Sequence, residues 1–249
     1  MEKSIMLHIY YRISDGSYKK NRLLNATKQH CLQNLLSAPE VQSWPSTTIK
    51  LRILMDNCKE TTQESIIKWL PEQRDAAWWA IQKINGGSSA QSFNAMLDVI
   101  KSANLPQTDY LLLVEDDYLW SDNWYRLLNE GLERADYVSG YDHLDKYING
   151  TDGGNPLVED GGEVTRVIKT KSRHWKLTNS TTLTFATKVK VLLEDEPIWR
   201  KHTTGTYPRD FDAFMELRNK GRTLITPIPG FSTHTEVDWL SPFIDWSKK

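Results

Sequence analysis

The chain has 249 residues, with 31 lysines and arginines against 32 aspartates and glutamates, a hydrophobic fraction of 39% and a charged fraction of 25%. This length allows a sizeable buried core, and the formal net charge of −1 argues against a protein that binds nucleic acid by neutralising its phosphates. No run of about 18 apolar residues is present, so no membrane span is expected, and the polar start of the chain does not match a signal peptide. The two cysteines, Cys31 and Cys58, fit neither a disulfide framework nor a zinc site. We therefore expect reduced thiols in a cytoplasmic setting, that of a bacterium, a phage or the host of a virus.

Residues 1–115 alternate between apolar runs and helical patterns. Strands are predicted where apolar residues run together, over 4–12, 48–55 and 109–114. Helices are predicted where apolar residues recur every three or four positions, over 23–36, 62–70 and 88–100. Residues 76–84 are ambiguous between strand and helix. The alternation predicts βαβ units and an open, mainly parallel sheet flanked by helices, with 109–114 as a buried central strand.

The second half of the sequence has shorter predicted elements. Strands are expected over 137–141, 164–169 and 183–186, and helices over 188–194 and 210–219. Residues 143–162 are rich in Gly, Asn and Asp, and we expect a long loop that is either a lid or a surface insert. No repeat or linker interrupts the pattern, which favours a single domain over 1–249.

Polar and charged residues follow three of the predicted strands at their carboxyl ends, where open α/β sheets bind ligands. They are Tyr11-Arg12, Asp56-Asn57 and Glu115-Asp116-Asp117. Three consecutive carboxylates repel one another, and a bound Mg²⁺ or Mn²⁺ would remove that cost. The alternative is a solvated acidic turn that precedes the next helix.

These residues resemble motifs of the glycosyltransferases with the GT-A fold, and the pattern is closest to the family-2 glycosyltransferases. Glu115-Asp116-Asp117 is similar to their DXD motif. In the Glu-Asp-Asp form of that motif the last carboxylate binds the metal, which implies Asp117 as a ligand, with Glu115 in the same metal site. His234 falls where some members place a late histidine near the metal and the diphosphate.

The resemblance also implies a set of residues that bind the nucleotide sugar. Asp56 resembles the aspartate that reads the nucleobase, and the turn 85–89, followed by Asn94, resembles the Asn/Gly-rich turn and helix that flank the nucleotide. The donor-binding residues implied in this way are Tyr11, Arg12, Asp56, Asn57, Gly86, Gly87, Asn94 and Asp116.

Arg209-Asp210-Phe211-Asp212 resembles the Glu-Asp segment whose aspartate is the catalytic base in inverting members. By this alignment Asp210 is the base. Arg209 stands where the family usually has Glu, which leaves Asp212 open as the alternative. A carboxylate can take a proton from an attacking hydroxyl. The structural alternative for Asp210 is a first-turn acid that is favoured by the helix dipole.

The resemblance covers roughly residues 5–236 and implies a GT-A, Rossmann-like fold. Residues 1–117 would form the nucleotide-sugar half and residues 118–249 the acceptor half. The implied activity is metal-dependent, inverting transfer of a hexose or deoxyhexose from a nucleotide-diphosphate donor, with UDP-sugars favoured, to a hydroxyl of a glycan or another acceptor. Mn²⁺ or Mg²⁺ would be the cofactor, because a bound metal neutralises the departing diphosphate.

Two other readings of the sequence remain. A sugar-phosphate nucleotidyltransferase should open with a Gly-rich phosphate loop after the first strand, and the segment 10–16 offers only Gly16. A non-catalytic module that binds nucleotide sugars or carbohydrates could use some of the ten tryptophans as stacking platforms, among them Trp120, Trp124, Trp175 and Trp199. Such a module needs neither the acidic triplet nor a separate acid at the start of a helix.

Overall fold

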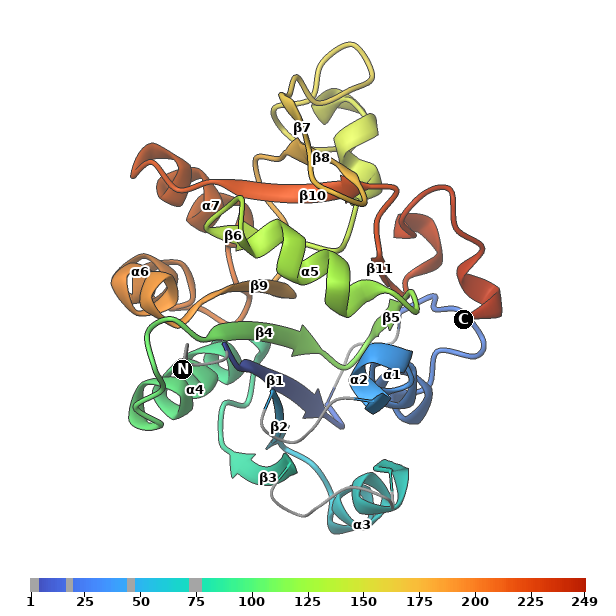
Figure 1. Cartoon of the computed structure of the whole chain (residues 1–249), viewed down its shortest axis with the longest axis vertical. Helices are drawn as coiled ribbons and strands as arrows, with labels where there is room; N and C mark the ends of the chain where they lie inside the picture. Colours follow the sequence, from blue (N-terminus) through green and yellow to red (C-terminus); the bar gives the residue numbers. More distant parts are fainter. Residues whose placement is uncertain (1–4, 17–19, 44–47, 72–77) are drawn as a thin grey trace.

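The computed structural model describes residues 5–16, 20–43, 48–71 and 78–249. A nine-stranded sheet in the order β3-β2-β1-β4-β9-β6-β10-β8-β7 runs through its centre (Figure 1). The four strands that come first in the chain pair in parallel with one another. They are β1 (Leu7–Ser14), β2 (Ile49–Asp56), β3 (Trp79–Ile84) and β4 (Tyr110–Glu115).

The strands of the second half extend this sheet in mixed directions. β9 (Phe185–Lys188) is antiparallel to both β4 and β6 (Tyr137–Val138), and β10 (Leu224–Ile228) is parallel to β6. The hairpin of β7 (Val167–Lys169) and β8 (His174–Leu177) completes the edge. A separate antiparallel pair joins β5 (Tyr118–Trp120) to β11 (Ser232–His234). The predicted α/β class with a mixed central sheet is confirmed.

Helices cover both faces of the sheet (Figure 1). One layer contains α1 (Lys28–Leu36), α2 (Pro39–Ser43) and α5 (Trp124–Leu132), with α3 (Glu60–Trp69) beside α1. The other layer contains α4 (Ser89–Ser102), α6 (Val189–His202) and α7 (Asp210–Asn219). Short 3₁₀ turns occupy Leu144–Tyr147, Gly150–Asp152, Val237–Trp239 and Trp246–Lys248. Of the helices in the described ranges, none has both the length and the apolar content that crossing a membrane requires.

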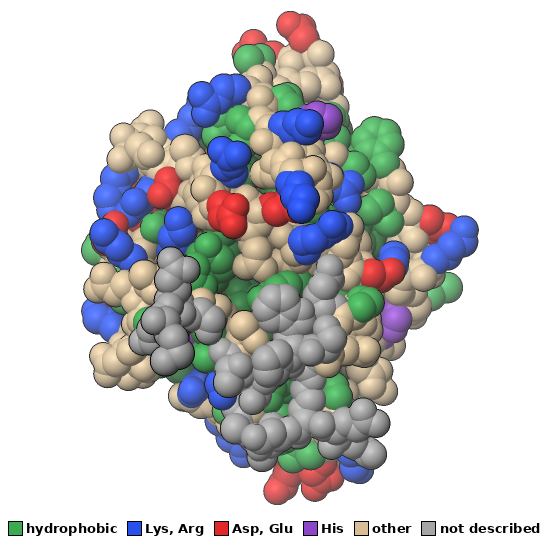
Figure 2. Space-filling model, viewed as in Figure 1, with side chains coloured by type: hydrophobic (Ala, Val, Ile, Leu, Met, Phe, Trp, Pro, Cys, Tyr) green, Lys and Arg blue, Asp and Glu red, His purple; other side chains and the backbone are tan. Residues whose placement is uncertain are grey.

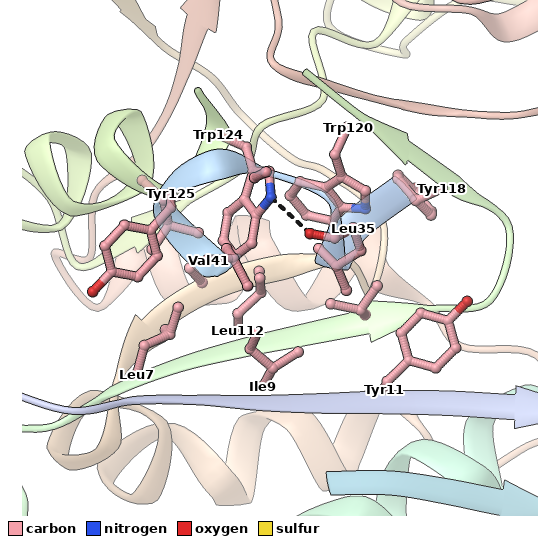
Figure 3. Packing of buried hydrophobic residues seen from close by; sticks show 14 of the residues in the cluster. Leu7, Ile9, Tyr11, Leu35, Val41, Leu112, Tyr118, Trp120, Trp124 and Tyr125 are labelled. Carbon is pink, nitrogen blue, oxygen red and sulfur yellow. Dashed lines mark hydrogen bonds between the residues drawn. The ribbon is translucent and has the colours of Figure 1, made fainter. Parts of the chain in front are cut away.

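The central strand β4 contributes to both hydrophobic layers, because successive side chains of a strand point to opposite faces. Leu112 packs in the α1/α5 layer and Leu111 in the α4/α7 layer. Figure 3 shows the first layer, in which the indole N–H of Trp124 donates to the carbonyl oxygen of Leu35 at 3.0 Å. Four tryptophans that were candidates for sugar stacking are almost fully buried and belong to the two hydrophobic layers instead: Trp120, Trp124 and Trp175 in the first layer and Trp199 in the second.

The elements differ from the sequence prediction mainly at their ends. α1 begins at Lys28 rather than near residue 23, because the hydroxyl of Thr27 accepts the backbone N–H of His30 and caps the helix there. α6 continues past residue 194 to His202 although it contains Pro197. The stretch 76–84, which was ambiguous between strand and helix, is a strand from Trp79 onward. Residues 76 and 77 of this stretch lie outside the described residues, as does residue 4 of the first predicted strand.

The loop over residues 143–162 is tied to the sheet. Just before it, the buried carboxylate of Asp142 forms an ion pair of 3.0 Å with Lys176 on β8. The buried ammonium group of Lys146 donates to the hydroxyl of Ser180 at 2.8 Å. These contacts link the start of the loop to β8 and to the segment that follows β8.

Candidate active site

A pocket of about 360 Å³ lies at the carboxyl ends of β1, β2 and β4, beside the start of α4. Seven of the predicted site residues line it: Arg12, Asp56, Asn57, Gly87, Glu115, Asp116 and Asp117. The parallel pairing of β1 with β2 and β4 explains this meeting, because it brings the three carboxyl ends to one edge of the sheet.

The first two carboxylates of the acidic triplet are each held by a basic side chain from another segment. Arg12 Nη2 lies 3.2 Å from Glu115 Oε1, across the β1–β4 pair. Asp116 Oδ2 accepts hydrogen bonds from Lys28 Nζ and, at 3.1 Å, from the backbone N–H of Ser14. Burial raises the pKa of both acids, and the charges of Arg12 and Lys28 oppose the rise. The chain thus supplies counter-charges to two of the three acids.

Asp117 is held by Arg22 and His234, which contact the same carboxylate oxygen. Its Oδ2 accepts from Arg22 Nη2 at 2.8 Å and lies 3.0 Å from His234 Nε2. Burial alone would raise the pKa of Asp117, but His234, Arg22 and Lys20 outweigh burial and hold the pKa well below its usual range. His234 Nδ1 accepts the backbone N–H of Glu236 at 3.2 Å, which leaves the ring hydrogen on Nε2. In this arrangement His234 Nε2 donates to Asp117 Oδ2.

One buried oxygen of the acidic triplet has no hydrogen-bond partner among the described residues, and it is Asp117 Oδ1. Within the described ranges, no three His, Cys, Asp or Glu side chains converge into a metal-binding group. Mg²⁺ is commonly bound by one or two carboxylates while substrate phosphates fill its other positions. Asp117 Oδ1 would be available to such a cation, whereas Glu115 Oε1 and His234 Nε2 are engaged by Arg12 and Asp117.

Asp56 shapes the turn that leads into α4. Its Oδ1 accepts the backbone N–H of Gly86 at 2.9 Å and that of Gly87 at 3.2 Å. A Cβ on Gly86 would lie 2.4 Å from the backbone nitrogen of Ser92, so only glycine fits there. Gly87 has a φ of +78°, which a side chain disfavours. The carboxylate predicted to read the nucleobase is thus also the group that holds this wall of the pocket.

Two other predicted donor-binding residues lie elsewhere. Tyr11 points into the core layer of α1 and α5 and is 1% exposed (Figure 3). Asn94 Nδ2 donates to the carbonyl oxygen of Thr203 at 2.9 Å, and Asn94 Oδ1 accepts from the Thr203 hydroxyl at 2.8 Å. Gln91 Nε2 donates to the carbonyls of residues 203–205 at 3.1 to 3.2 Å. Gln91 and Asn94 thus fix the segment 203–208, whose Thr206, Tyr207 and Pro208 form a wall of the pocket.

Asp210 is the first residue of α7 and comes two residues after Pro208, the last residue of this wall. Its Oδ1 accepts the backbone N–H of Phe211 at 2.9 Å. Burial raises the pKa of Asp210 to about 6, and its charge acts on Glu115, so the two acids share one electrostatic environment. Asp212, the alternative base, is exposed and lies 3.7 Å from Arg209. The geometry favours Asp210.

Apart from Arg12, the basic residues around the acidic triplet were missed by the sequence analysis. Lys20 and Arg22 line the pocket and come from the segment before α1, and Lys28, the partner of Asp116, is the first residue of α1. No motif marks these three residues. Lys20 also pairs with Glu236 at 3.1 Å. Their positions depend on contacts with residues that lie far away in the sequence, which local patterns do not reveal.

A scan of the chain against known protein families finds no match, and a search of the curated proteins finds none either. Solved structures do resemble it. The structure of GalNAc-T7 with UDP, GalNAc and Mn²⁺ superposes with a TM-score of 0.59 at 9% identity, covering 94% of this chain and 44% of that one. The galactosyltransferase LgtC with donor and acceptor sugar analogues gives 0.49 at 10% identity, covering 88% and 72%. TarS residues 1–349 from S. aureus gives 0.49 at 13% identity, covering 89% and 58%.

At such low identity these likenesses show the fold alone. The fold assignment depends on the GalNAc-T7 structure, because the TM-scores of the other two structures are lower, at 0.49. The expected GT-A fold is confirmed. The chain spans less than half of the length of the GalNAc-T7 chain.

Proposed function

We propose that the chain is a metal-dependent, inverting glycosyltransferase that takes a sugar from a nucleotide-diphosphate donor, with UDP-sugars favoured. The observation that carries the proposal is the buried, unpartnered oxygen of Asp117, together with Asp210, whose charge acts on Glu115 of the same triplet and whose pKa is raised to about 6. One acid is suited to the leaving-group side of a transfer reaction and the other to the attacking side.

The donor diphosphate is proposed to lie against Asp117, between the cations that line the pocket. Arg22 and Lys20 line this pocket, and Arg12 lies on β1 beside Glu115 of β4. A divalent cation held by Asp117 Oδ1 would supply the charge that stabilises the departing diphosphate. Arg22 fixes the orientation of Asp117 through its other oxygen, Oδ2.

The nucleoside is proposed to lie on the wall made by Asp56, Asn57 and Gly87. The two N–H groups that bind Asp56 keep this wall fixed before a ligand arrives. A rigid wall lowers the entropy cost of binding a flat base.

The acceptor hydroxyl is proposed to lose its proton to Asp210 as it attacks the sugar. A base whose pKa is near the working pH is deprotonated often enough to act and still basic enough to take a proton. An inverting transfer needs a single base on the face opposite to the leaving group, and Asp210 is the acid that lies apart from the triplet.

The test is a screen of UDP-, GDP- and dTDP-sugars for release of the nucleoside diphosphate, with water or a simple sugar as acceptor. Wild-type protein should release one of the three, and Asp210→Asn should keep nucleotide binding but lose turnover by about a hundredfold or more. Asp212→Asn is the matched control and should retain turnover. Absence of turnover with retained nucleotide binding would indicate a binding module. Pyrophosphate release from a nucleoside triphosphate and a sugar phosphate would indicate a nucleotidyltransferase.

A further inference from the structure

The segment between α6 and α7 forms a closed loop beside the start of α4. The backbone N–H of Arg209 donates to the carbonyl oxygen of His202 at 2.9 Å, which joins the two ends of the loop. Within the loop, the carbonyl oxygen of Thr206 accepts the backbone N–H of Ala90 at 3.3 Å, and the side chain of Gln91 donates to three further carbonyls. The loop is therefore fastened at its ends and to the first turn of α4.

This loop carries an exposed aromatic side chain into the candidate active site. Tyr207 is 60% exposed and lines the pocket, and it is the only aromatic residue among the described residues that do so. The other large hydrophobic side chains that are exposed in the described ranges lie outside the pocket. Figure 2 shows one face of the molecule, on which charged and other polar side chains surround small groups of hydrophobic ones. An exposed ring inside a pocket with a polar lining is suited to contact with a flat ligand.

The backbone on both sides limits where the ring of Tyr207 can go. Pro208 follows it, and a proline keeps the residue before it in an extended conformation. On the other side, Thr206 is held by its hydrogen bond to Ala90. A tyrosine side chain has only two χ angles to order, so a platform of this kind costs little conformational entropy when a ligand binds.

The loop and the wall proposed for the nucleoside meet at the start of α4. That wall ends at Gly87, three residues before Ala90, whose backbone N–H holds the loop. The pocket therefore has a polar wall, with Asp56 and Asn57, and an aromatic residue from the neighbouring loop. Every nucleobase has a flat π-face that can stack on an aromatic side chain.

We propose that Tyr207 stacks on the nucleobase of the donor, so that the base lies between this ring and the wall of Asp56, Asn57 and Gly87. The inference rests on the proposed function, because it assigns a further binding residue to the nucleotide of the same site. Stacking tolerates any base and needs no charge. Tyr207 therefore contributes affinity for the nucleoside, whereas Arg22 acts on the diphosphate.

The experiment is a calorimetric titration of the whole chain with UDP, GDP and dTDP. The nucleoside of the nucleotide that binds most tightly is titrated next, followed by inorganic pyrophosphate. Tyr207→Ala should weaken binding of the nucleotide and of its nucleoside by the same factor, about tenfold or more, and leave pyrophosphate binding unchanged.

Two further variants separate the ring from the loop that carries it. Tyr207→Phe keeps the aromatic face and should bind the nucleotide and the nucleoside as wild type does. Thr204→Ala changes an exposed side chain of the same loop outside the pocket, so it is the matched control and should change nothing. Tyr207 is exposed, so its variants should fold, which thermal melting checks.

NMR of the bound nucleoside gives a second readout. Protons that lie over the face of an aromatic ring resonate upfield, so the base protons should shift upfield on binding to wild type and to Tyr207→Phe. In Tyr207→Ala this shift should be lost. A loss of affinity through a distorted loop would not follow this pattern.

Two results would overturn the inference and leave the proposed function standing. One is nucleotide binding that Tyr207→Ala leaves unchanged. The other is weaker nucleotide binding with unchanged nucleoside binding, which would place the ring away from the base. If UDP, GDP and dTDP all fail to bind wild type, the inference and the proposed function are both contradicted.

Discussion

Asp117 and His234 are joined by a hydrogen bond of 3.0 Å between Oδ2 and Nε2, across a sequence separation of 117 residues. The bond exists because β5, which follows the acidic triplet, pairs with β11, which ends in His234. The ring of His234 also packs edge-on against Tyr118. The late part of the chain therefore fixes the orientation of a carboxylate that the central strand β4 delivers.

The activity should depend on the ionisation of Asp210. Its pKa is raised to about 6, so the carboxylate is protonated below that pH and cannot accept a proton. With the best donor, kcat/KM should fall about tenfold for each pH unit below 6 and level off above it. The pH profile of Asp212→Asn should keep the same shape. A profile that is flat between pH 5 and 7 would show that another group is the base.

Arg22 should contribute to diphosphate affinity and not to nucleoside affinity. Arg22→Gln removes a cation from the pocket, so UDP should bind about tenfold more weakly, while uridine, which has no phosphate, should bind as it does to wild type. Calorimetry with both ligands measures the difference, and Arg134→Gln serves as control. Equal weakening of UDP and uridine would point to a general distortion of the pocket instead.

Gly86 should tolerate no side chain. In Gly86→Ala the new Cβ would lie 2.4 Å from the backbone nitrogen of Ser92 and 2.8 Å from Asp56 Oδ2, and neither contact is acceptable. The turn before α4 must shift, which should cost about 1–3 kcal/mol of the free energy of unfolding. Chemical denaturation measures the loss. Gly162→Ala, where a Cβ would meet open space, should be neutral.

The buried ion pair of Lys176 with Asp142 should matter for stability. Lys176→Met leaves the carboxylate of Asp142 buried without its cation, and we expect a loss of about 3–5 kcal/mol. Lys248→Met breaks an exposed pair with Asp245 and should leave the free energy of unfolding nearly unchanged. Urea unfolding of the two variants compares them directly. Similar small losses would mean that the buried pair is not needed to hold this loop.

Much of the fold could be predicted because local patterns decide it. The apolar run of β4 is typical of a central strand, and α7 covers the residues 210–219 that its periodicity predicts. The three-residue strands β5 and β11 could not be predicted, since each is too short to show a period. α6 continues beyond its predicted end at residue 194, through Pro197, to His202.

The candidate site could be predicted only in part, for a related reason. Acids that follow parallel strands meet at one edge whatever their spacing, so Asp56 and Asp117 could be placed from the sequence. The residues that contact these acids could not be predicted from the sequence. Arg22 reaches Asp117 from an irregular segment, and Asn94, predicted to bind the donor, holds Thr203 instead.

The most direct test of the proposed function is a calorimetric titration of the chain with UDP, with and without Mn²⁺, in wild type and in Asp117→Ala. The account predicts that Mn²⁺ tightens UDP binding by about tenfold or more and that Asp117→Ala loses this gain. Asp122→Ala, which removes an exposed acid outside the pocket, should keep it. If UDP, GDP and dTDP all fail to bind with or without Mn²⁺, or if Asp117→Ala keeps the full effect of Mn²⁺, the pocket is not a nucleotide-sugar site of the proposed kind.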